Sequence, residues 1–175
     1  MTQFMTSQWL NPKMILALML IITSVAIDLR TKKVPNKLII IGFAMVVILV
    51  SLVDGVSGFW PAAASLGAAV VFSFPLYSLR AIAAGDVKLI LVLSLLISWN
   101  LTITMIFASM IWGSILGIAR VILDGKTKQF FQNLLLVFKK SSTPQQNLSH
   151  IPYTVAILFG FLTAVELATA GISWL

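Results

Sequence analysis

The sequence contains no cysteine and a single histidine, His150, among its 175 residues. The absence of cysteine excludes disulfides, thiolate metal sites and a cysteine nucleophile. One histidine cannot by itself build a histidine metal site. Charge is scarce as well, because only 10% of the residues are charged, whereas soluble domains carry about a quarter. The composition is therefore not that of a soluble protein.

Apolar residues dominate what is present. They make up 59% of the chain, and the mean hydropathy is +1.04. About six membrane helices of about 20 residues each would occupy most of the length and leave no room for a separate soluble domain. We therefore predict an all-α, polytopic integral membrane protein with one membrane-embedded domain over residues 1–175. The predicted spans are 14–29, 38–53, 61–79, 81–98, 101–119 and 152–174.

The basic residues predict how these spans are oriented. Eleven of the twelve lysines and arginines lie in or next to three connections, between spans one and two, three and four, and five and six. Because cytoplasmic loops carry the excess of Lys and Arg, these connections are predicted to be cytoplasmic and both termini to lie on the other side. The same bias argues against a cleaved leader, although Ser24-Val25-Ala26 resembles a cleavage site. The net charge of +7 fits cytoplasmic loops beside anionic lipid better than a nucleic-acid partner.

The predicted cytoplasmic connection 120–150 contains apolar residues at helical spacing. They are Phe130, Phe131, Leu134, Leu135 and Phe138. Lysines flank this segment on both sides. The pattern predicts an amphipathic helix that lies in the membrane interface.

Two aspartates are unusual because of their apolar surroundings. Asp28 ends the first span, and Asp86 lies about five residues, or roughly 8 Å, into the fourth. The predicted orientation brings both acids to the cytoplasmic side at similar depth. Two carboxylates in a confined site share a proton, so that one can act on water as general base and the other as general acid. Other interpretations stay open: Asp28 as an interfacial acid, Asp86 as a helix cap, or the pair as a proton relay.

Three segments carry motifs. They are Asp28-Leu29-Arg30-Thr31-Lys32-Lys33-Val34-Pro35-Asn36, Gly85-Asp86-Val87-Lys88-Leu89, and Ile151-Pro152-Tyr153-Thr154-Val155-Ala156-Ile157 followed by Gly160. In this order they resemble the motifs of the type IV prepilin peptidases: an Asp and Arg before a basic Val-Pro-Asn loop, Gly-x-Gly-Asp, and Pro-Tyr-Gly-x-Ala. The resemblance covers nearly the whole chain. Ala83 stands where the family usually has the first Gly of the second motif, and Thr154 also replaces a usual Gly.

The resemblance implies a multi-pass aspartic endopeptidase of the bacterial inner membrane. Such an enzyme removes a short basic leader from prepilins or pseudopilins with a hydrophobic helix, at the cytoplasmic face. Asp28 and Asp86 are then the catalytic dyad, with the roles of base and acid left open, and no metal or organic cofactor is implied. Residues expected to bind substrate or support the motifs are Arg30, Pro35, Asn36, Gly85, Lys88, Pro152 and Tyr153.

The chain has neither the cysteines nor the cytoplasmic domain of larger family members that also methylate their product. It therefore resembles the short, peptidase-only form of tight-adherence pilus systems, whose substrates are Flp-like prepilins. Two other classes of function stay open. One is a small proton-coupled transporter that uses the two acids as a relay. The other is a non-catalytic scaffold for pilus or secretion assembly.

Overall fold

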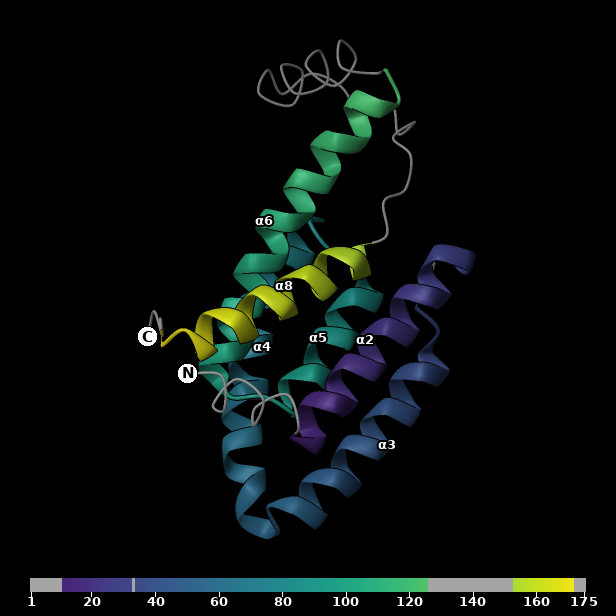
Figure 1. Cartoon of the computed structure of the whole chain (residues 1–175). Coiled ribbons are helices and arrows are strands. Elements are labelled where there is room, and N and C mark those ends of the chain that lie inside the picture. The colour runs from purple at the N-terminus through teal and green to yellow at the C-terminus, as the bar shows by residue number, and fades with distance from the viewer. Residues whose placement is uncertain (1–10, 33, 126–152, 172–175) are drawn as a thin grey trace.

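The computed structural model describes residues 11–32, 34–125 and 153–171 (Figure 1). These residues form six α-helices and one short 3-10 helix, with no strand among them, which confirms the predicted all-α fold over this part of the chain. The elements are α2 (Pro12–Thr31), α3 (Asn36–Val53), η1 (Val56–Gly58), α4 (Phe59–Ser78), α5 (Ala84–Ser94), α6 (Trp99–Leu123) and α8 (Tyr153–Thr169). The predicted interfacial helix over residues 130–140 lies outside the described residues.

Four stretches within the described ranges are long and apolar enough to cross a membrane: α2, α3, η1 together with α4, and α6. Their outward faces expose many large apolar side chains, such as Ile40, Phe74 and Ile111. Large apolar surfaces of this kind suit lipid rather than water. The chain is therefore a membrane protein, built on at least these four helices.

The boundaries of several helices differ from the prediction. The predicted span 81–98 contains a helix only over α5, which has 11 residues and is about 16 Å long, roughly half of the hydrocarbon thickness. Residues 81–83 are not helical. Helix α6 continues to Leu123, into the segment predicted to be a polar connection. Hydropathy detects apolar residues but not the points at which a helix begins or ends, which accounts for these differences.

The short helix α5 lies at the centre of the bundle. It packs against α3, α4, α6 and α8. Its side chains Leu89, Ile90 and Leu93 are almost inaccessible and belong to the main apolar core. Because α5 is surrounded by longer helices, most of its apolar side chains are buried in protein, whereas Ala83 and Ala84 at its amino-terminal end are exposed.

The most extensive helix pair is α6 with α8, which cross in Figure 1. Gly160 allows the two main chains to approach closely, since a Cβ atom there would lie 2.7 Å from the Ser109 nitrogen and 2.8 Å from the Met105 carbonyl oxygen. Small residues serve the same purpose in many membrane helix pairs. The Trp112 indole donates to the Thr163 hydroxyl at 3.0 Å, which adds a polar contact to this pair.

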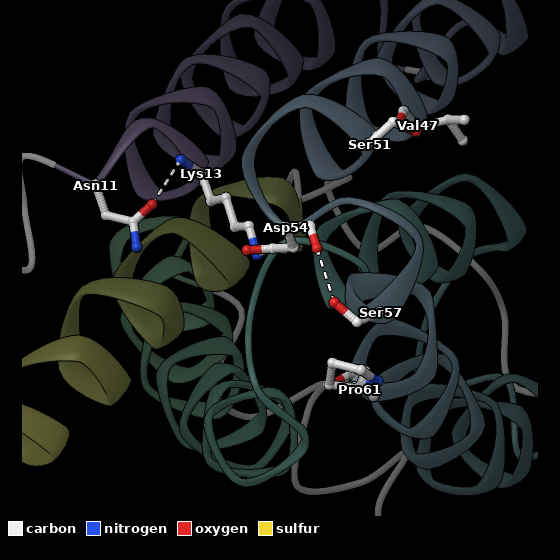
Figure 2. Close-up of polar contacts among 8 residues, drawn as sticks. Asn11, Lys13, Val47, Ser51, Asp54, Ser57 and Pro61 are labelled. Carbon is white, nitrogen blue, oxygen red and sulfur yellow. Dashed lines mark hydrogen bonds and ion pairs between the residues drawn. The ribbon is translucent and has the colours of Figure 1, made fainter.

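At the opposite end from the Asp28 end of α2, an ion pair fastens α2 to α3. Asn11 caps α2 by accepting from the Lys13 main-chain nitrogen at 3.0 Å. The Lys13 ammonium reaches across to the carboxylate of Asp54, the residue that ends α3 (Figure 2). The two side chains are 20% and 28% exposed, so water screens the pair only in part.

We expect this ion pair to contribute modestly to stability. Lys13→Met and Asp54→Asn, combined in a double-mutant cycle, should give a coupling energy of about 0.5–1 kcal/mol. Thermal unfolding in detergent measures it. The exposed pair Arg120–Asp124, one helical turn apart at 3.4 Å, serves as the comparison and should give a smaller coupling. A coupling near zero for Lys13 and Asp54 would contradict the expectation.

Candidate active site

A pocket of about 720 Å³ opens where α2 ends and α5 begins. The non-helical link between α4 and α5 forms one of its walls. Irregular main chain at membrane depth is tolerated where it is buried in protein or lines a water-filled cavity. The pocket is lined by Asp28, Lys32, Val34, Asn36, Arg80, Ala81, Ile82, Ala83, Ala84, Gly85, Asp86, Lys88 and Tyr153.

Asp28 enters this pocket from the last turns of α2. Its side chain is only 5% exposed. Its Oδ2 accepts a hydrogen bond of 2.8 Å from the Thr154 hydroxyl of α8. Asp28 is therefore not an acid that points freely into the interfacial water, as one interpretation of the sequence held.

Asp86 enters the pocket from the first turn of α5 and is likewise 5% exposed. The N-cap of this helix is Ala83, so Asp86 is not itself the N-cap residue. The sequence placed Asp86 about five residues into a span that begins at residue 81, whereas α5 begins at Ala84 and Asp86 is its third residue. At this position the positive end of the helix dipole lies close to the carboxylate and stabilises negative charge in the pocket.

The structure thus places Asp28 and Asp86 at the same pocket, although 58 positions separate them in the sequence. Helix α8 lies against both α2 and α5 and so bridges the elements that carry the two acids. Each acid is nearly buried, yet each contributes to the wall of a cavity large enough for several water molecules or a peptide segment. Both acids therefore line one cavity, which a mechanism with two carboxylates and a water molecule requires.

Of the other predicted site residues, Gly85, Lys88, Asn36 and Tyr153 also line the pocket. The Lys88 ammonium donates to the Asn36 side-chain oxygen at 2.9 Å and so connects α5 to the start of α3. Gly85 lies close to the loop, since a Cβ atom on it would be 3.3 Å from the Val34 Cβ. A larger residue at position 85 would therefore push this loop away.

Two further predicted residues lie outside the lining, and a third cannot be placed. Arg30 is exposed in the last turn of α2. Pro35 is the N-cap of α3, where its extended main chain fixes the entry into that helix. Pro152 lies outside the described residues. None of these observations gives Arg30 or Pro35 a direct role at the pocket.

Tyr153 connects the pocket to α6. Its hydroxyl lies 3.2 Å from the Ser109 hydroxyl, and its ring lies against Gly113, where a Cβ atom would come within 2.9 Å of it. Tyr153 and Asp86 line the same pocket. The tyrosine therefore holds the α8 side of the pocket in place against α6.

The comparison with known families supplies the decisive observation. Residues 14–118, more than half of the chain and including both aspartates, match the type IV leader peptidase family. The chain belongs to that family. The suspected relationship to prepilin peptidases is thereby confirmed, and the leader peptidase family is one of membrane proteases. Comparisons with curated proteins and with solved structures gave no match.

Two basic residues of this leader peptidase were not singled out as site residues by the sequence. Lys32 and Arg80 line the pocket, and both adopt left-handed main-chain conformations, with φ of 54° and 58°. Each follows the last turn of a helix, a position that glycine usually takes. A left-handed main-chain conformation at a lysine or an arginine cannot be predicted from the sequence. The rim of the pocket thus carries three cations, Lys32, Arg80 and Lys88.

The role of Thr154 was also missed. The sequence marks it only as a departure from the glycine usual in leader peptidases, whereas its hydroxyl contacts Asp28. It lies beyond the matched range 14–118, as does all of α8. Over the ranges that the structure describes, no group of three His, Asp or Glu side chains gathers where it could hold a metal ion.

Proposed function

We propose that this leader peptidase is an aspartic endopeptidase that removes the short basic leader from Flp-like prepilins. The observation that carries the proposal is the presence of two nearly buried aspartates, Asp28 and Asp86, at one pocket of a chain that belongs to this family. A proton relay would use the same acids, but the family that the chain matches is one of leader peptidases.

The proposed reaction needs only the two carboxylates and water. One carboxylate, as general base, takes a proton from a water molecule held between the two acids. The water oxygen then attacks the carbonyl carbon of the scissile peptide bond. The protonated partner gives its proton to the leaving nitrogen, and the C–N bond breaks. The products are the leader with a new carboxylate and the mature pilin with a new amino group.

The cations at the rim support binding of an extended substrate segment. Lys32, Arg80 and Lys88 lie around the two acids and are suited to bind carbonyl or carboxylate oxygens of the substrate chain. The concentration of basic residues near this end of the bundle also supports placing the pocket at the cytoplasmic face of the inner membrane, with both termini on the other side. The hydrophobic helix of the prepilin would then remain in the bilayer while its leader enters the pocket.

The proposal is tested by co-expressing the chain with an Flp-like prepilin in cells that lack other leader peptidases. We expect the prepilin to become shorter, and sequencing of its new amino terminus to locate the cut before the hydrophobic helix. A prepilin in which the basic residues of the leader are replaced by neutral ones is the matched control and should be cut more slowly. Full retention of the leader, with both proteins present in the membrane, would refute the proposal.

A further inference from the structure

The contact between Thr154 and Asp28 joins two residues that are 126 positions apart in the sequence. Thr154 is fully buried and Asp28 is 5% exposed. The Thr154 Oγ1 donates to the Asp28 Oδ2 at 2.8 Å, an ordinary distance for a strong hydrogen bond between a hydroxyl and a carboxyl oxygen. One end of the Asp28 carboxyl group is therefore bound to α8, while the side chain still lines the pocket.

Thr154 is held in place by its surroundings. Its β-branched side chain has few rotamers. Its neighbour Tyr153 contacts Ser109 of α6, and Gly160 brings α8 into main-chain contact with α6 one to two turns further along. The hydroxyl is thus presented from a rigid helix pair and not from a loop.

The carboxyl group of an aspartate rotates over a broad range about its terminal torsion angle. A fixed donor on Oδ2 restricts this rotation, and the Thr154 hydroxyl does not contact Oδ1. We propose that Thr154 is a positioning residue that sets the orientation of the Asp28 carboxyl group for catalysis. A glycine at this position would have no side chain to donate such a bond. This inference rests on the proposed peptidase function.

The test measures cleavage kinetics of a purified Flp-like prepilin by the full chain in detergent, for wild type and three variants. Thr154→Val keeps the shape and removes the donor, and we expect kcat to fall about tenfold with KM unchanged within about twofold, the scale of one lost hydrogen bond to a carboxylate. Thr154→Gly should show the same fall in kcat, because it too removes the donor. Thr154→Ser keeps the donor and should retain kcat within about threefold.

Thr169→Val is the control for substitution on the same helix. The Thr169 hydroxyl donates to the Glu166 main-chain oxygen within α8, and we expect kcat to stay at the wild-type value. Thermal unfolding of every variant is measured beside the kinetics. If Thr154→Val destabilises the protein, the comparison of Thr154→Ser with Thr154→Gly at a temperature where both are folded decides the matter.

The outcomes test two claims, the positioning role of Thr154 and the peptidase function itself. A fall in kcat for the valine and glycine variants with recovery in the serine variant supports the positioning role. Equal kcat for all variants overturns it, and so does a loss that follows thermal stability and is not restored by serine. A wild-type protein that cleaves no prepilin refutes the peptidase function itself, whatever the variants do.

Discussion

Replacement of either buried aspartate by asparagine is expected to reduce leader cleavage by about 10²- to 10⁴-fold, the usual contribution of a general acid or base. Asparagine has nearly the same size and shape as aspartate, and its side-chain oxygen can still accept from Thr154 at position 28. It cannot take up or release a proton in the reaction. Cleavage of a co-expressed prepilin, followed over time by the change in its size, measures the effect of Asp28→Asn and Asp86→Asn.

The double variant, with both Asp28→Asn and Asp86→Asn, tests whether the two acids act together. If both acids act on one water, removing the second should cost little after the first has been lost, so the two effects will be far from additive. Asp124→Asn is the matched control, because Asp124 is an exposed acid that pairs with Arg120 and is not part of the pocket lining. Normal cleavage by either single variant would exclude the dyad.

Cleavage data also separate the peptidase from the two other classes of function. A proton relay that depends on Asp28 and Asp86 would lose transport driven by a pH gradient in the same variants, without any prepilin being cut. An assembly scaffold would keep its activity when the acids are neutralised. Only the peptidase function predicts that the wild type hydrolyses the prepilin and that the variants lose this hydrolysis.

Much of the fold could be predicted from hydropathy, because lipid-facing helices must be apolar along most of their length. Four of the six predicted spans correspond to α2, α3, α4 and α6 with shifts of a few residues at their ends, and the sixth overlaps α8. The fourth span was overestimated. Residues 81–83 are as apolar as the helix that follows, and Ile82 is buried without being helical. An apolar composition does not specify the conformation of the main chain.

The candidate site was accessible to prediction only in part. Asp28 and Asp86 could be paired by an argument from loop charge, and the structure places both at one pocket. The contacts around them depend on packing between distant segments. The approach of Thr154 to Asp28 depends on how α8 packs against α2, and the left-handed conformations of Lys32 and Arg80 depend on how two helices end. The residue pattern of a single helix shows neither how helices pack against one another nor which main-chain conformation ends a helix.

Substitution of Gly160 by alanine is expected to destabilise the protein by about 1–3 kcal/mol, the usual cost of overpacking a tight contact. The added Cβ would lie 2.7 Å from the Ser109 nitrogen and 2.8 Å from the Ser109 Cα atom. These are main-chain atoms and cannot rotate away, so α6 and α8 must separate. Because α8 carries Thr154 to Asp28, we also expect slower cleavage at temperatures where the variant is still folded.

Gly117→Ala on α6 is the matched control, since a Cβ atom there would meet nothing within 4 Å. Alanine also favours helix over glycine by about 1 kcal/mol, so this variant should be at least as stable as the wild type. Thermal unfolding in detergent and the initial rate of prepilin cleavage, measured on the same preparations, give the two readouts. If Gly160→Ala and Gly117→Ala were equally stable, the close approach of α6 and α8 would not be what holds the α8 side of the pocket. If Gly160→Ala lost stability but kept its full cleavage rate below its melting temperature, the packing of α8 on α6 would support the fold without setting the geometry at Asp28.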